Sequence, residues 1–165
     1  SGRRPVAGGT TQGKAISETL MKLAAEDERI YAITPAMTTG AHLTEFAKKY
    51  PKRFIDAGIA EEHALVLANA LALSGMKPYV TIYSTFLQRG YDQVNHDIAR
   101  MGGDVVVGID RCGVIGEDGV SHQGIFDVSL LLPIPGITLA QGKDAAESAR
   151  LLATGFATEG PYLLR

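Results

Sequence analysis

The sequence has 165 residues, of which 45% are hydrophobic and 21% charged, and these proportions indicate one globular domain and exclude a disordered chain. Its 16 Lys and Arg against 18 Asp and Glu give a net charge of −2, which excludes the basic excess expected of a nucleic-acid or membrane-surface protein. The single Cys112 cannot form an internal disulfide, and no apolar run approaches the ~18 residues of a membrane helix, so we expect a cytoplasmic protein.

The chain opens on a polar, glycine-rich segment, and we expect residues 1–9 to be a flexible remnant of cleavage from something longer. Residues 10–165 are predicted to form one domain in which strands alternate with helices. In chain order, the patterns predict a helix ending at residue 27, a strand at 29–33, a helix at 42–50, a strand at 54–56, a helix at 60–74, a strand at 77–83, a helix at 86–101, a strand at 104–109, a glycine-rich loop at 110–135, a strand at 136–139, a helix at 144–156 and a strand at 161–164.

This alternation predicts an α/β fold, with a three-layer αβα arrangement around a mostly parallel central sheet. The Ala/Leu-rich segment 60–74 carries almost no charge beyond its first turn, so most of its surface is predicted to be buried, in this domain or against a partner. Ligands of such sheets bind beyond the carboxyl ends of the strands. The segments there that carry chemistry are TPAM (34–37), GIAEEH (58–63), YSTFLQRGYDQ (83–93) and DRCGVIGEDGVSHQG (110–124).

The first turn of the predicted helix 60–74 holds Glu61 and Glu62, and two interpretations of this pair stay open. Acidic residues are common at helix amino termini because they face the positive end of the helix dipole. Alternatively, because neighbouring residues point about 100° apart on a helix, one of the two carboxyls faces the crevice, where it is suited to proton transfer.

Arg89 and His122 each allow two interpretations as well. Arg89 either reaches the crevice, where its guanidinium suits a phosphate or carboxylate, or lies on a surface helix paired with Asp92 or Asp97. His122 lies in the predicted loop 110–135, and loops of this length inside a compact domain are typically functional. Its imidazole suits proton shuttling or binding of a substrate hydroxyl, or it is hydrogen-bonded to its own backbone.

Several common motifs are missing from the sequence. It contains no GxGxxG or Walker A segment, no GxSxG turn, no CxxC pair and no HExxH, so dinucleotide binding, P-loop chemistry, serine hydrolysis and a structural zinc site have no support. Cys112 has no base partner nearby in the sequence and is predicted to be a small buried hydrophobe.

The segments AITPAM, GIAEEHA, IYSTFLQRGYDQVNHD and DRCGVIGEDGVSHQGIFD, in this order, resemble the central pyrimidine-binding domain of thiamine-diphosphate enzymes of the transketolase group. Within that group they are most similar to the 1-deoxy-D-xylulose-5-phosphate synthase family, and the likeness runs from about Ile16 to Arg165. The resemblance implies a transferase that uses thiamine diphosphate to condense pyruvate with glyceraldehyde 3-phosphate, with release of CO₂.

The resemblance also implies roles for single residues. Glu61 corresponds to the catalytic glutamate that hydrogen-bonds N1′ of the cofactor's aminopyrimidine. Ile59 corresponds to the bulky residue that supports the bent cofactor, and Phe86 to the ring stacked on the pyrimidine. His63 is expected to pack against a neighbouring helix rather than to act in catalysis.

The substrate residues are implied in the same way. Tyr83, Arg89 and Arg111 would lie toward the phosphate of glyceraldehyde 3-phosphate. Asp118 and His122 would reach substrate hydroxyl or carbonyl groups, and His122 would also be a catalytic proton donor or acceptor in the step that joins the two substrates.

The resemblance covers only part of such an enzyme. Glu62 stands where the family usually has glutamine, and Gly90 where it usually has alanine. The family holds the diphosphate and Mg²⁺ in a separate domain with a GDG…N segment, and a carboxyl-terminal domain adds a phosphate-binding arginine. We therefore expect no metal ligands in this chain, those two domains and a second copy in a homodimer as partners, and no activity of the chain alone. The alternatives are a non-catalytic assembly or dimerisation module, and the pyrimidine-binding domain of another transketolase-type enzyme.

Overall fold

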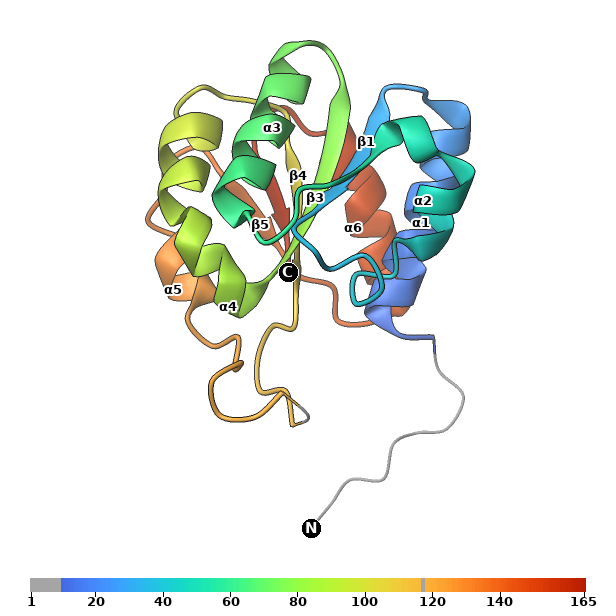
Figure 1. Ribbon diagram of the computed structural model, residues 1–165. Coiled ribbons are helices and arrows are strands. Elements are labelled where there is room, and N and C mark those ends of the chain that lie inside the picture. The colour runs from blue at the N-terminus through green and yellow to red at the C-terminus, as the bar shows by residue number, and fades with distance from the viewer. Residues whose placement is uncertain (1–9, 117) are drawn as a thin grey trace.

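The computed structural model describes residues 10–116 and 118–165, which form a sheet between two layers of helices (Figure 1). The strands are β1 (Ile30–Thr34), β2 (Phe54–Asp56), β3 (Lys77–Tyr83), β4 (Val106–Asp110), β5 (Thr138–Ala140) and β6 (Tyr162–Leu164). The α-helices are α1 (Gln12–Glu26), α2 (Thr44–Lys49), α3 (Glu61–Leu73), α4 (Ser84–Leu87), α5 (Asp127–Leu131) and α6 (Ala145–Ala157). Short 3₁₀ turns lie at Pro51–Arg53 and Gln88–Gly90, and a π-helix at Gln93–Ala99. The predicted remnant, residues 1–9, lies outside the described residues.

The strands of the described chain pair in parallel throughout, in the order β2-β1-β3-β4-β6-β5. The predicted three-layer α/β fold is therefore confirmed. The order reverses between β1 and β3, because β1 continues to β2 on one side and β3 to β4 on the other. The connections that follow β1 and β3 therefore run to opposite sides of the sheet and leave a crevice between them at the carboxyl ends of the strands. Ligands bind in this crevice in folds of this kind.

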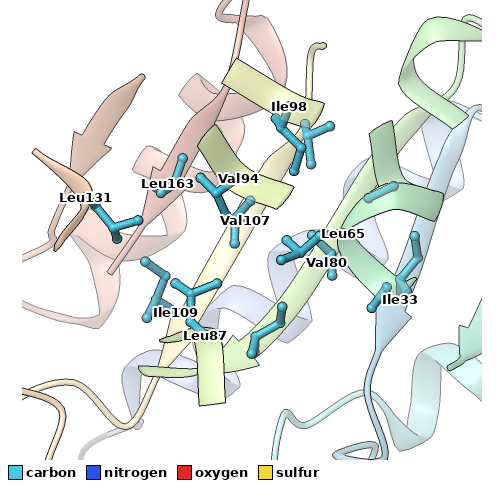
Figure 2. Close-up of a cluster of buried hydrophobic side chains, with 14 of the residues drawn as sticks. Ile33, Leu65, Val80, Leu87, Val94, Ile98, Val107, Ile109, Leu131 and Leu163 are labelled. Atoms are coloured by element: carbon cyan, nitrogen blue, oxygen red, sulfur yellow. The ribbon is translucent and has the colours of Figure 1, made fainter. Parts of the chain in front are cut away.

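Alternate side chains of the central strands enter two hydrophobic clusters, one on each face of the sheet. Val80 and Val107 belong to the cluster drawn in Figure 2, which also takes side chains from α3, α4, the π-helix and α5. Tyr79 and Val106, their neighbours in sequence, belong to the cluster under α1, α2 and α6. The central strands are thus covered on both faces, and the edge of the sheet is where polar side chains can gather.

Helix α3 is less buried than its composition predicts. Its inner face packs on the sheet through Ala64, Leu65 and Ala68, but Val66 is 43% exposed and Leu73 54% exposed. The prediction that the domain itself buries most of this helix is wrong, and its burial against a partner stays a prediction. His63 is exposed, so the packing role expected for it is also wrong.

The predicted helix 86–101 begins earlier, at Ser84, and is divided into α4, a 3₁₀ turn and the π-helix. The division falls where the segment presses on α3, since a Cβ atom on Gly90 would overlap the side chain of Leu65. The predicted loop 110–135 contains α5, whose five residues are too few to give a periodic pattern. Within the described ranges, no helix combines the length and the apolar composition needed to cross a membrane.

Candidate active site

The four predicted segments meet at the carboxyl edge of the sheet. TPAM follows β1, GIAEEH follows β2 and begins α3, YSTFLQRGYDQ starts at the end of β3, and the long loop follows β4. In Figure 1 this loop, coloured yellow to orange, extends from the edge of the sheet near the C-terminus. The candidate site is therefore built by connections that follow parallel strands of the sheet.

Glu61 is the first residue of α3, and only 3% of it is exposed. Its neighbour Glu62 is exposed, so the helix turns one carboxyl inward and the other to solvent, as the angular argument predicts. The residue before the helix, Ala60, supplies no capping side chain. The Glu61 carboxylate therefore combines burial with a position at the positive end of a helix dipole.

The cation beside Glu61 is Arg89. Its Nη1 lies 3.3 Å from Oε2 and 3.5 Å from Oε1 of Glu61. The arginine side chain is 58% exposed whereas that of Glu61 is 4% exposed, so the guanidinium covers a buried carboxylate from the solvent side. The surface interpretation, in which Arg89 pairs with Asp92 or Asp97, is wrong.

Aromatic rings gather at the end of β3. Phe86 stacks on Tyr83 with ring centroids 5.6 Å apart and planes 5° apart, and His122 meets Phe86 edge to face at 5.5 Å. The guanidinium of Arg111 lies over the Tyr83 ring, 5.4 Å from its centroid. Residues from β3, α4 and the long loop thus form one cluster, which we call the aromatic cluster: Tyr83, Phe86, Arg111 and His122.

The long loop that carries His122 is held by hydrogen bonds at its base and within the loop. Gly113 and Gly124 exchange backbone hydrogen bonds of 2.7 and 2.9 Å, which close the loop. Within it, the Gln123 amide group binds both backbone groups of Ile115 at 2.7 and 2.8 Å. The His122 Nδ1 atom lies 2.8 Å from the Ser121 hydroxyl, so its local hydrogen bond is to a side chain of the loop.

Asp118 also lies in this loop and contacts the aromatic cluster through Arg111, whose Nη1 is 3.4 Å from Oδ1 of Asp118. Within the described residues, the other oxygen of Asp118 is buried and has no hydrogen-bond partner. A buried carboxylate oxygen without a donor is costly and suits a site that receives a hydroxyl group of a ligand.

Ile59 and Cys112 differ sharply in their surroundings. Ile59 is 80% exposed, one residue after a glycine with φ of 70°, so it projects from the connection between β2 and α3. Cys112 is half-buried, packs against the core and donates from Sγ to the Ile109 carbonyl oxygen at 3.0 Å. Burial raises the pKa of the Cys112 thiol, and the nearby carboxylate of Asp127 raises it further, so the reactive thiolate form is disfavoured.

Sequence reasoning missed several polar residues at this edge. Asp127 and Arg165 form an ion pair of 2.7 Å in which the carboxylate is 1% exposed, and Arg165 also donates to the Gly124 carbonyl oxygen. Asp110 accepts from the Thr81 hydroxyl at 2.8 Å, and burial raises the pKa of its carboxyl. These pairs join distant parts of the chain, so no local pattern signals them.

A cavity of about 240 Å³ lies near Asp110, on the α1 side of the sheet. Its lining includes Gln12 and Gln141 besides Asp110 and Arg165. Among the residues implied for cofactor and substrate, Arg111 lines this cavity, whereas Glu61, Ile59 and Phe86 do not.

Motif reading also missed Asp56, which ends β2 two residues before Gly58. Its carboxylate accepts hydrogen bonds from the backbone N–H groups of Ala36 and Gly58 and from the Thr38 hydroxyl, at 2.9, 3.0 and 3.1 Å. The bond from the Gly58 N–H to Asp56 is that of an Asx-turn, and an aspartate followed by a glycine two residues later is its local sequence signal. Burial alone would raise the pKa of Asp56, but these donors hold it below its ordinary value.

The residues at this edge fit a flat, nitrogen-containing ring. A buried carboxylate can bind a ring nitrogen, a half-buried phenyl group can stack on the ring, and an exposed isoleucine can support it from beneath. In residues 10–116 and 118–165, by contrast, no three His, Cys, Asp or Glu side chains are grouped so that they could hold a metal ion.

Solved structures with this fold define the class of protein. A split-gene transketolase, solved as an inactive beta4 tetramer, superposes with a TM-score of 0.85 at 26% identity, over 96% of this chain and 51% of its own. A transketolase of Pichia stipitis in complex with sedoheptulose 7-phosphate gives a TM-score of 0.83 at 19% identity, over 98% of this chain and 26% of its own. The chain has the fold of a transketolase-type domain of thiamine-diphosphate enzymes.

Within this class, residues 9–165 match the transketolase pyrimidine-binding domain, and the chain belongs to that family. The 1-deoxy-D-xylulose-5-phosphate synthase of Listeria monocytogenes serotype 4b is 51% identical over 163 residues, which are 98% of this chain and 27% of the relative. The synthase of Bacillus cereus strain G9842 is 53% identical over 151 residues, which are 91% of this chain and 24% of the relative. The chain thus spans about a quarter of the length of these curated relatives.

Proposed function

We propose that this chain acts as the pyrimidine-binding part of a 1-deoxy-D-xylulose-5-phosphate synthase, which condenses pyruvate with glyceraldehyde 3-phosphate and releases CO₂. The observation that carries the proposal is the Glu61 carboxylate, 3% exposed, at the start of α3 and at the same edge as the aromatic cluster. The 51% identity to the Listeria synthase over nearly the whole chain favours this enzyme over other transketolase-type enzymes.

Glu61, Ile59 and Phe86 would hold the aminopyrimidine of thiamine diphosphate. When bound, this cofactor supplies the carbanion that adds to the keto carbon of pyruvate. Glu61 would hold a proton between its carboxylate and N1′ of the ring, and its burial keeps water from competing for that proton. Ile59, which is 80% exposed, would support the ring from below, and Phe86 would stack on it.

Tyr83, Arg89 and Arg111 would bind the phosphate of glyceraldehyde 3-phosphate, because two guanidinium groups and a phenol offer the donors that a phosphate needs. Asp118, with its unpartnered buried oxygen, would accept a hydrogen bond from a substrate hydroxyl. His122, whose ring lies 5.5 Å from that of Phe86, would hold or release the proton of the reacting carbonyl oxygen.

The proposed enzyme needs further parts. A diphosphate-binding domain would hold the cofactor's diphosphate with Mg²⁺, and a carboxyl-terminal domain and a second copy of the chain would complete a cytoplasmic homodimer. Exposed apolar side chains near the site suit such contacts, among them Ile59, Val120 and Phe126, with exposures of 80%, 100% and 59%. The same side chains support the second candidate, a non-catalytic assembly or dimerisation module.

The test places this chain in the Listeria synthase in exchange for the corresponding domain, and measures product formation from pyruvate and glyceraldehyde 3-phosphate with thiamine diphosphate and Mg²⁺. We expect an active chimera in which Glu61→Ala lowers kcat by about 100-fold or more, because a positioned acid–base group typically contributes that much. The matched control is Glu62→Ala, which removes the exposed neighbouring carboxylate and should leave kcat within about twofold.

The outcomes separate the candidates. A folded chimera that transfers ketol groups between sugar phosphates, without using pyruvate, would favour another transketolase-type enzyme. A folded and dimeric chimera with neither activity would favour the assembly module. Full activity of the Glu61→Ala chimera would remove Glu61 from its assigned role.

A further inference from the structure

Asp56 joins two connections that belong to different parts of the candidate site. One oxygen of its carboxylate, Oδ1, accepts from the backbone of Ala36 at 2.9 Å and of Gly58 at 3.0 Å, and the other accepts from the Thr38 hydroxyl at 3.1 Å. Ala36 and Thr38 lie in the connection after β1, and Gly58 lies in the connection after β2. One ionised side chain therefore joins the two connections beyond the ends of their strands.

The connection after β2 leads directly to the cofactor residues. Gly58, whose φ is 70°, is followed by Ile59, by Ala60 and by Glu61, the first residue of α3. No side chain caps this helix at Ala60, so its start is held by the preceding backbone. The Gly58 N–H bond to Asp56 is the side-chain contact in this connection, and it acts beside the backbone hydrogen bond from the Ala57 N–H to the Thr34 carbonyl oxygen at 2.9 Å.

The connection after β1 leads to Tyr83. Leu43 and Ala41 donate backbone hydrogen bonds to Thr38 and Met37 at 2.9 and 2.8 Å, which fold this connection back on itself. Its Gly40 lies so close to Tyr83 that a Cβ atom there would overlap the phenol oxygen. Thr38 thereby connects Asp56 to the segment around Gly40 that packs against the Tyr83 hydroxyl.

Ala36 adds a reason why the carboxylate is needed. It is an alanine with a φ of 58°, a left-handed conformation that costs about 1 kcal/mol or more for a residue with a side chain. Its N–H group is donated to Asp56 in this conformation. The strained backbone therefore persists because the Asp56 carboxylate compensates for it.

We propose that Asp56 is a positioning residue that sets the placement of Glu61 and of Tyr83 together, so that the cofactor side and the substrate side of the site are aligned by one carboxylate. Its catalytic consequence rests on the proposed function, but its structural consequence does not. An isosteric amide can replace it in part, since the oxygen introduced by Asp56→Asn could accept from Ala36 and Gly58 while its amino group donates to the Thr38 hydroxyl. The disruptive variant is therefore Asp56→Ala, and Asp56→Asn is the conservative one.

The first arm of the test is amide hydrogen exchange of the chain itself, as wild type, Asp56→Ala and Asp56→Asn. In Asp56→Ala we expect faster exchange in both connections at once, in residues 36–43 and 57–61, by about tenfold or more, and in Asp56→Asn part of the protection should return. The matched control is Asp27→Ala, which removes a carboxylate with backbone and side-chain donors at the amino ends of the strands. Acceleration confined to the Ala36 and Gly58 amides, or equal in the control, would overturn the proposal.

The second arm uses the chimeric synthase at a temperature where circular dichroism shows wild type and variants fully folded. Asp56→Ala should raise the KM for thiamine diphosphate and the KM for glyceraldehyde 3-phosphate, each by about tenfold, with partial rescue in Asp56→Asn, whereas Asp27→Ala should change neither. Thr38→Val removes only the hydrogen bond between Thr38 and Asp56 and should raise the second KM alone. Unchanged KM values in Asp56→Ala would overturn the positioning role.

The two arms separate this inference from the function on which it rests. A wild-type chimera without activity would contradict the proposed function, and hydrogen exchange would then decide the role of Asp56 alone. If Asp56→Ala unfolds the chain, Thr38→Val decides in its place. Unchanged exchange of residues 36–43 and an unchanged KM for glyceraldehyde 3-phosphate in Thr38→Val would then overturn the proposal.

Discussion

At the scale of single residues, the contact between Gly40 and Tyr83 gives the sharpest prediction. The phenol oxygen occupies the space that a Cβ atom on Gly40 would need. Gly40→Ala should therefore lower the free energy of unfolding by about 1–3 kcal/mol, the usual cost of an added methyl group in a packed site. In a Tyr83→Phe background the same substitution should cost about 1 kcal/mol less, because the opposing oxygen is gone.

Urea denaturation of the four chains in this cycle measures the coupling. Additive losses would mean that the loop of Gly40 and the Tyr83 ring do not constrain one another. The backbone is no obstacle to alanine here, since Gly40 is not among the residues with positive φ.

At the scale of elements, the long loop depends on a close approach at its base. A Cβ atom on Gly124 would overlap the Arg111 carbonyl oxygen and lie 2.8 Å from the Ser84 side chain. Because a backbone atom cannot move aside as a flexible side chain can, Gly124→Ala should lower the free energy of unfolding by about 2 kcal/mol and separate His122 from Phe86.

Gly116→Ala in the same loop is the matched control, since a Cβ atom there meets nothing within 4 Å. Urea denaturation gives the stability, and the imidazole proton shifts of His122 in NMR spectra report its contact with the Phe86 ring. Equal effects of the two substitutions would contradict the role given to the base of the loop.

The sequence predicts the elements well where their signal is local. The apolar, β-branched runs of β1, β3 and β4 predict strands, and the spacing of Glu61 and Glu62 on a helix predicts that one of the two carboxyls is buried, although spacing does not say which one. The partner of Arg89 could not be predicted, because Glu61 lies 28 positions away and Asp92 is nearer in sequence. Helix α5 was missed for a different reason, since five residues provide little more than one turn of pattern.

The candidate site likewise combines features with a local signal and features without one. The motifs that follow the predicted strands could be placed at one end of the sheet, because the carboxyl ends of parallel strands lie on the same side. The hydrogen bonds of Asp56, the ion pair between Asp127 and Arg165 and the space for Tyr83 at Gly40 depend on the fold as a whole. Local patterns carry no information on such distances.

At the scale of the whole molecule, stability in acid depends on a carboxylate far from the site. Asp27 follows α1 and binds the Arg29 side chain at 2.8 and 2.9 Å and Lys77 of β3 at 3.2 Å. The hydrogen bonds from the Arg29 side chain hold the pKa of Asp27 well below its ordinary value. Since the folded-state pKa is the lower one, Asp27 stabilises the fold above the unfolded pKa of about 3.9 and loses this effect as the pH falls through the folded value.

Asp27→Asn should therefore lower the free energy of unfolding at pH 7 by about 1 kcal/mol, because the carboxylate is partly exposed and its ion pairs are screened. The difference from wild type should shrink steadily below about pH 4. Urea denaturation between pH 2 and pH 7 tests this, with Glu45→Gln as the control, whose pair with Lys48 is exposed on both sides and should give nearly no difference. A constant difference across the range would contradict the linkage.

The position of β6 has a consequence for how the sheet is made. Although it follows the other five strands in sequence, it lies inside the sheet between β4 and β5. During synthesis on the ribosome, β5 leaves the exit tunnel before the strand that joins it to the sheet has been added. Until Leu164 emerges, the nascent chain exposes the edge of β4 and the apolar face of α6, the kind of surface that chaperones cover. Among the six strands of the described residues, β6 is thus the one whose addition joins β5 to the rest of the sheet.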